Sequence, residues 1–182
     1  SMARVGTVEK LAVKSQDTEA KTHSIDIDSD GFLSSIRTID LSADTHADTT
    51  GNVDLTGVGQ AVKVVGAKTN TLIGGSAIDT LTGGAGVDKI TGAGGADVLD
   101  GGDGNDIFIY AASSDFVTGT AVVDTVTGGA GDADTIQIAG AISIASNQSM
   151  ARVGTVEKLA VASQDTDAKT HSIDIDSDGF LS

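Results

Sequence analysis

Carboxylates recur at a fixed interval in the middle of this chain. The aspartates that keep this interval are nine residues apart: Asp79, Asp88, Asp97 and Asp106. Each of them closes a stretch rich in glycine, and glycine tolerates positive φ, so that successive carbonyl oxygens can point into one space. Carbonyl oxygens joined by a charged carboxylate at adjustable distances are ligands that suit calcium, a hard cation, better than zinc or copper. The spacing therefore predicts calcium sites.

The glycine stretches have the pattern Gly-Gly-x-Gly-x-Asp. GGAGVD (83–88) and GGDGND (101–106) fit it fully, whereas GGSAID (74–79) and GAGGAD (92–97) each lack one glycine. A preceding stretch, VGAKTN, ends in Asn70 instead of an aspartate. Four consecutive units in register are a far more specific signal than one unit alone.

Short strands must position these turns. Three-residue β-type runs separate them, and their central apolar residues are also nine apart: Leu72, Leu81, Ile90, Leu99 and Phe108. Strands this short are stable only when like strands stack above and below them, as in a solenoid. We therefore predict an all-β, parallel β-solenoid in which two units make one coil. Leu72, Ile90 and Phe108 should then share one sheet, and Leu81 and Leu99 the other.

The rest of the chain supports an all-β fold with a thin core. Only 3% of the residues are aromatic, and there are 24 glycines, no proline and no cysteine. VEKLAVKSQ (8–16) could form about two amphipathic helical turns, but alternating β-type runs dominate the residues after it. The formal charge is −15, and aspartate supplies 23 of the 26 acidic residues, which excludes a basic groove for nucleic acid. No apolar run is long enough to insert into a membrane.

The nonapeptide units over 74–109 resemble those of the RTX (repeats-in-toxin) glycine- and aspartate-rich family. The resemblance implies a β-roll that holds Ca²⁺ between turns two units apart, so that Asp79 faces Asp97 and Asp88 faces Asp106. Carried over to this chain, it implies the following metal ligands: Asp79, Gly83, Gly84, Gly86, Asp88, Gly92, Gly95, Asp97, Gly101, Gly102, Asp103, Gly104 and Asp106. VVDTVTGGAGDADTIQI (122–138) is similar to the end of such a block, where Asp124, Asp132 and Asp134 are weaker candidates.

A long internal repeat sets the domain organisation. Residues 1–34 return as 149–182 with only two differences, Lys14/Ala162 and Glu19/Asp167. We interpret 1–148 as one tandem module, with irregular solenoid strands over 1–63, the RTX roll over 64–109 and closing strands over 110–148. Residues 149–182 would begin the next module, so other copies of the module are the expected partners. At about 18 residues per coil, a module would add about eight coils, or roughly 40 Å.

DIDSDG (26–31), repeated at 174–179, is a second acidic motif. It fits half of an EF-hand loop, but Arg37 stands where the bidentate acid belongs. An exposed strand, or a non-helical calcium loop formed by Asp26, Asp28 and Asp30, explains the motif better.

No catalytic motif is present: the chain lacks H-E-x-x-H, G-x-S-x-G and a P-loop. The expected role is a non-enzymatic, calcium-stabilised structural repeat of the bacterial cell surface, such as a surface layer, fibre or adhesin stalk. One alternative is a module that binds a glycan, ice or a host surface, for which Thr80, Thr82 and Thr91 hint at an outward ladder. Another is the non-catalytic RTX part of a secreted enzyme.

Overall fold

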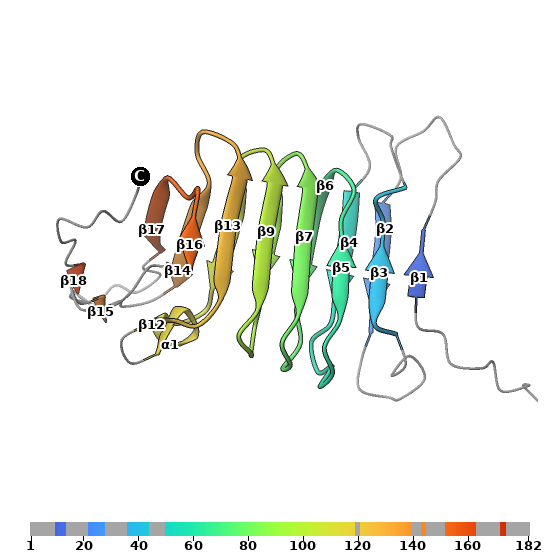
Figure 1. Cartoon of the computed structure of the whole chain (residues 1–182), viewed down its shortest axis with the longest axis horizontal. Helices are drawn as coiled ribbons and strands as arrows, with labels where there is room; N and C mark the ends of the chain where they lie inside the picture. Colours follow the sequence, from blue (N-terminus) through green and yellow to red (C-terminus); the bar gives the residue numbers. More distant parts are fainter. Residues whose placement is uncertain are drawn as a thin grey trace, which may run out of the picture.

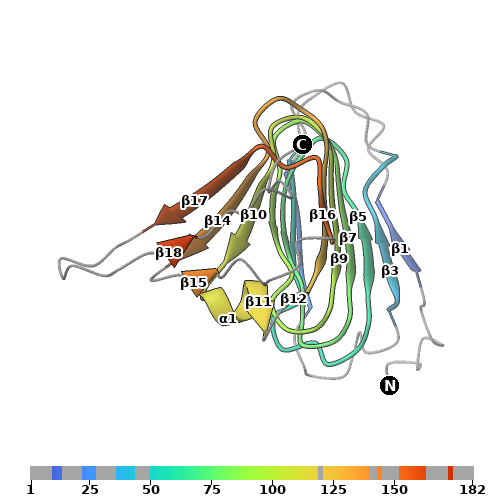
Figure 2. The ribbon, with the colours of Figure 1, turned by 60° about the vertical axis from the view of Figure 1, so that its left-hand side comes forward.

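Two parallel sheets face each other over the central part of the described chain (Figure 1). The structure is a computed structural model, and it describes residues 10–13, 22–27, 36–43, 50–118, 121–139, 143–144, 152–162 and 172–173. The first sheet has seven strands in the order β1 (Lys10–Ala12), β3 (Thr38–Asp40), β5 (Lys63–Val65), β7 (Thr80–Ala85), β9 (Val98–Asp103), β13 (Thr125–Ala130) and β16 (Val153–Gly154). The second has seven in the order β2 (Thr22–Asp26), β4 (Thr50–Asp54), β6 (Thr69–Ile73), β8 (Lys89–Thr91), β10 (Ile107–Tyr110), β14 (Thr135–Ala139) and β17 (Lys158–Ala162). Towards the C-terminal end β14 and β17 splay away from β13 and β16 (Figure 2).

Successive strands of these two sheets alternate between them, so the chain winds into a parallel β-roll (Figure 2). In the centre of the roll Leu72 pairs with Ile90 and Ile90 with Phe108. Leu81 pairs with Leu99 in the opposite sheet. Two nine-residue units therefore make one coil, and the predicted fold and the predicted stacking are both confirmed.

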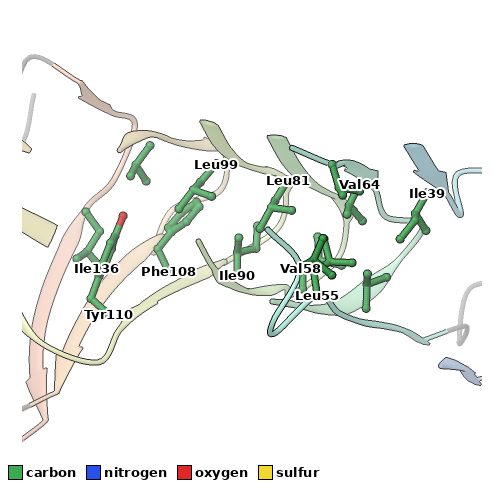
Figure 3. Close-up of a cluster of buried hydrophobic side chains, with 14 of the residues drawn as sticks. Ile39, Leu55, Val58, Val64, Leu81, Ile90, Leu99, Phe108, Tyr110 and Ile136 are labelled. Carbon is green, nitrogen blue, oxygen red and sulfur yellow. The ribbon is translucent and has the colours of Figure 1, made fainter. Parts of the chain in front are cut away.

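The core consists of two facing rows of apolar side chains, one row from each sheet (Figure 3). Each central strand contributes one inward residue, and Leu72, Leu81, Ile90 and Phe108 are fully buried. Because these side chains come from strands only three to six residues long, each coil depends on its neighbours for most of its buried surface. The thin core expected from the composition thus takes one residue from each strand along much of its length.

Several coils outside the nonapeptide block are much longer than 18 residues. Leu11 pairs with Ile39 and Phe108 with Ile136, in each case 28 residues further on. The extra length after β10 holds the short helix α1 (Ser113–Phe116) and the hairpin β11 (Val117–Thr118) and β12 (Ala121–Val122). Phe116 fills the core beside Tyr110, with ring centroids 4.9 Å apart. The expectation of about eight uniform coils per module is therefore wrong.

Strands of the second copy continue the roll. β16 pairs with β13, and β17 pairs with β14 over Thr135–Ala139. In the first copy the segment that corresponds to β17 is β1. Its residues KLA (10–12) form a strand and do not begin the helical turns that the sequence allowed. β1 lies in the first sheet whereas β17 lies in the second.

A separate pair of strands outside the two large sheets, β15 (Ser143–Ile144) and β18 (Ser172–Ile173), is also parallel. Within the described part of the chain no helix is long and apolar enough to cross a membrane.

Candidate metal centres

The turns between strands carry two rows of polar residues, acidic except for Asn70, one along each long edge of the roll. The turns that come after strands of the first sheet lie at the top in Figure 1, where the arrows of β7, β9 and β13 end. Their residues, here called the upper row, are Asn70, Asp88, Asp106, Asp134 and Glu157. The turns at the opposite edge carry the lower row, which is Asp79, Asp97 and Asp124.

Each row is tied together by one carboxylate oxygen per residue. In the upper row the backbone N–H of Asp88 donates to Oδ1 of Asp106 at 2.8 Å, and that of Asp106 to Oδ1 of Asp134 at 2.7 Å. In the lower row Asp79 N–H donates to Oδ1 of Asp97, and Asp97 N–H to Oδ1 of Asp124, both at 2.8 Å. The expected pairs, Asp79 with Asp97 and Asp88 with Asp106, are therefore brought together.

The second carboxylate oxygen of most of these residues has no partner. Oδ2 is buried and accepts no hydrogen bond in Asp88, Asp97, Asp106 and Asp134. An unpaired buried carboxylate oxygen is costly, and such atoms are rare in native proteins. Burial raises the pKa of Asp88 and Asp97 to about 7, because the charged form loses its hydration. The same cause raises the pKa of Asp106 to about 6.

In the upper row, the Oδ2 atoms without partners lie next to the first glycine of their own turns. A methyl group on Gly83 would overlap with Oδ2 of Asp88 and with the carbonyl oxygen of Gly101, one coil further on. A methyl group on Gly101 would meet Oδ2 of Asp106 and the carbonyl oxygen of Gly128 in the same way. A carboxylate oxygen and a carbonyl oxygen from the next coil therefore converge on a space that only glycine leaves open.

The lower row has a related cradle at Gly92. A methyl group there would lie 2.5 Å from Oδ2 of Asp97 and 3.3 Å from Oδ2 of Asp124. The Tyr110 hydroxyl donates to this Asp124 oxygen at 3.0 Å. Burial raises the pKa of Asp124 above its ordinary value. Two carboxylates thus share this space.

The donor set fits a hard cation. Among the described residues no three His, Cys, Asp or Glu side chains gather around one point, which disfavours a zinc-type site. The converging donors are instead one or two carboxylates joined by backbone carbonyls, the oxygen ligands that calcium takes in flexible geometry. A cation in these spaces would supply the partner that the buried oxygens lack. The residues present therefore fit Ca²⁺.

Two turns satisfy their oxygens without a cation. The side-chain amide of Asn70 donates to the carbonyl oxygen of Gly83 and to Oδ1 of Asp88, each at 2.7 Å. In the turn over 74–79, Oδ2 of Asp79 accepts the backbone N–H of Gly75 at 2.8 Å. These two turns depart from the full pattern, through Asn70 and Ala77.

The other residues predicted as ligands fall into two groups. Several adopt positive φ and shape the turns, namely Gly84, Gly86, Gly95, Gly102 and Gly104. The side chains of Asp103 and Asp132 are exposed and stand outside both rows. Asp26 is exposed on β2, as expected for a solvated strand, whereas Asp28 and Asp30 lie outside the described residues.

Two side chains of these sites were not anticipated from the sequence. The Tyr110 hydroxyl donates to Asp124, and Glu157 extends the upper row into the second copy by accepting the backbone N–H of Asp134 at 2.8 Å. Asn70, which stands in place of an aspartate in the sequence, ends the upper row. Asp134 and Glu157 are 28 and 23 residues beyond the preceding members of the row, so the nine-residue period does not reveal them. The only signal was GGAGDAD, a glycine turn that resumes at 128.

Comparison with known families agrees with this geometry. The family model of the RTX calcium-binding nonapeptide repeat matches four copies, over residues 66–99, 73–108 and 111–132. These matches contain both rows as far as Asp124 and end before Asp134. No curated protein and no solved structure matches the chain.

Proposed function

Because the chain carries RTX calcium-binding nonapeptide repeats, we propose that it is a calcium-stabilised structural module of a secreted protein that forms a surface layer, fibre or adhesin stalk. Repeats of this family are typical of secreted proteins. The observation that carries the proposal is the set of buried Oδ2 atoms without partners in Asp88, Asp97, Asp106 and Asp134.

The proposed ligands are these carboxylates and the carbonyl oxygens that converge with them. Oδ2 of Asp88 with the Gly101 carbonyl, and Oδ2 of Asp106 with the Gly128 carbonyl, would each hold one ion between adjacent coils. The ion supplies a double positive charge where burial penalises carboxylate charge. Since the ligands of one ion come from two coils, binding opposes separation of the coils and is coupled to folding.

A structural role is supported by the internal repeat. A near-identical second copy begins 148 residues after the first, and its strands β16 and β17 extend both sheets without a break in pairing. Stacked coils of this kind add length by repetition, as in other solenoids. The outward threonines give less support to a binding role, because Thr80 and Thr82 lie in the first sheet and Thr91 in the second.

The proposal is tested by measuring β-structure with circular dichroism during a calcium titration. Without calcium, the thin core cannot offset chain entropy and the repulsion between aspartates, so the chain should be largely unfolded. It should gain β-structure at roughly 10⁻⁴–10⁻³ M calcium, the range of extracellular modules. Magnesium at the same concentration should do much less, because it demands a tighter octahedral shell.

Alanine variants separate the sites from general acidity. Asp88→Ala and Asp106→Ala should each raise the calcium concentration at half-folding by about tenfold, a loss of about 1.4 kcal/mol. Asp26→Ala is the matched control, because it removes the same charge from an exposed position on β2. Identical spectra with and without chelator, or equal effects of the three variants, would contradict the proposal.

A further inference from the structure

The last turn of the upper row is completed by the second copy of the repeat. Several hydrogen bonds join the turn over 128–134 to that copy. Asp134 N–H donates to Oε2 of Glu157 at 2.8 Å, and Gly129 N–H to Oγ1 of Thr155 at 2.8 Å. Lys158 N–H in turn donates to the Asp134 carbonyl at 3.0 Å. Residues from both sides of the duplication boundary at 148/149 thus form one turn pair.

This turn pair contains the same cradle as the nonapeptide turns before it. A methyl group on Gly128 would overlap with Oδ2 of Asp134 and with the carbonyl oxygen of Thr155. One coil earlier, a methyl group on Gly101 would likewise overlap with Oδ2 of Asp106 and with the carbonyl oxygen of Gly128. The Thr155 carbonyl therefore takes the place that a turn glycine has one coil earlier.

The carboxylate of Asp134 independently indicates a cation site, because one of its oxygens is buried without a hydrogen-bond partner. Its side chain is fully buried and its Oδ2 accepts no hydrogen bond. The Glu157 carboxylate accepts the backbone N–H of Asp134, and Oδ2 of Asp134 remains without a partner. A buried anionic oxygen aimed at a carbonyl oxygen repels it unless a cation stands between them.

We propose that Asp134, Gly128 and Thr155 form a calcium site that bridges consecutive modules, with Glu157 positioning the coil that carries Thr155. This inference rests on the proposed calcium-stabilised role. Thr7 and Glu9 occupy the same places in the first copy as Thr155 and Glu157 in the second. Every junction of an array would therefore have the same site, and calcium would join modules as well as stiffen them.

The test combines calcium stoichiometry by isothermal titration calorimetry with hydrogen exchange of the 182-residue chain. In the unmodified chain, calcium should increase the protection of amides in β7–β10 and also in β16 and β17. Asp134→Asn should bind one calcium ion fewer, and the protection of β16 and β17 should no longer change with calcium. β7–β10 should respond as before. Asp132→Asn is the matched control, since it removes one charge from an exposed side chain of the same turn.

The two proposals fail in different ways. Calcium-dependent protection of β7–β10 combined with unchanged stoichiometry and unchanged β17 protection in Asp134→Asn would overturn the junction site alone. An Asp132→Asn variant that behaves like Asp134→Asn would overturn it too, as would loss of protection over the whole roll in Asp134→Asn. No calcium-dependent protection anywhere in the unmodified chain would refute the proposed function itself.

Discussion

At the scale of single residues, Asn70 shows how an amide can replace a cation. Its amide nitrogen donates hydrogen bonds to the Gly83 carbonyl and to Asp88, next to the space that Gly66 leaves open. Asn70→Asp would put an anionic oxygen there, as in the later turns of the upper row. We expect this variant to bind one additional calcium ion in a calorimetric titration and to fold less well in chelator.

The control for this change is Asn52→Asp, which adds the same charge at an exposed position on β4. It should leave the stoichiometry unchanged. Unaltered stoichiometry in Asn70→Asp as well would mean that the amide does not stand in for an ion.

The buried carboxylates also predict a pH dependence. The pKa values of Asp88 and Asp97 are raised to about 7 and that of Asp106 to about 6, against about 4 in an unfolded chain. The calcium-free folded state therefore binds protons more tightly than the unfolded state does. The resulting stabilisation is complete below about pH 4 and is lost as the pH rises through 6 to 7.

Measured by circular dichroism, the calcium-free chain should accordingly contain more β-structure at pH 5 than at pH 8. The calcium concentration at half-folding should rise as the pH falls through this range, because protons compete with calcium for the carboxylates. β-structure that decreases from pH 8 to pH 5 without calcium would show that these aspartates are not buried as described.

At the scale of the turn, Ala93 carries a cost that its neighbours avoid. It takes the second glycine position of the turn over 92–97 and has a φ of 66°. This left-handed conformation costs a non-glycine residue about 1–2 kcal/mol, whereas glycine loses about 0.5–1 kcal/mol of chain entropy. Ala93→Gly should therefore raise the free energy of unfolding by about 0.5–1 kcal/mol in saturating calcium, measured by urea unfolding.

Ala96→Gly is the control in the same turn, since Ala96 is also exposed but does not have positive φ. It should lower the free energy of unfolding. If the two variants changed stability equally, backbone conformation would not be the cause of the difference.

Turns and strands were predictable from the sequence where the nine-residue period holds. The pairing of Asp88 with Asp106 and the stacking of Leu72 on Ile90 result from that period, because equal spacing fixes both register and face. The period says nothing about how the roll resumes after β10, where α1 and a hairpin intervene. It also cannot show that Phe116 folds back into the core, or that Asp134 joins the same row as Asp106.

At the scale of the whole molecule, the strands give the length of one module. β1 and β17 begin at equivalent residues of the two copies, Lys10 and Lys158. Among the described residues, fourteen strands alternate between the two large sheets from β1 to β17, both included. Thirteen strand-to-strand steps therefore separate β1 from β17, which is six and a half coils. At about 4.8 Å per coil, each module adds about 31 Å to the axis.

Electron microscopy of a fragment with several modules in calcium should show stiff rods with an axial repeat near 31 Å. The stiffness results from continuous pairing across the junction and from the absence of proline or a polar linker there. The same fragment in chelator is the control and should lose its rod shape. Globules joined by free hinges in saturating calcium would contradict a continuous roll.

The half coil left over in each module has a geometric consequence. The identical segments Lys10–Ala12 of β1 and Lys158–Ala160 of β17 lie in opposite sheets and therefore on opposite sides of the rod. If every module added such a half coil, the array would have the symmetry of a twofold screw, and a given side would recur only at every second module, about 62 Å apart. Any surface that one module presents would then be shown alternately on both sides. Such a rod could join neighbours on its left and right with the same contact, which is how a filament becomes part of a two-dimensional lattice.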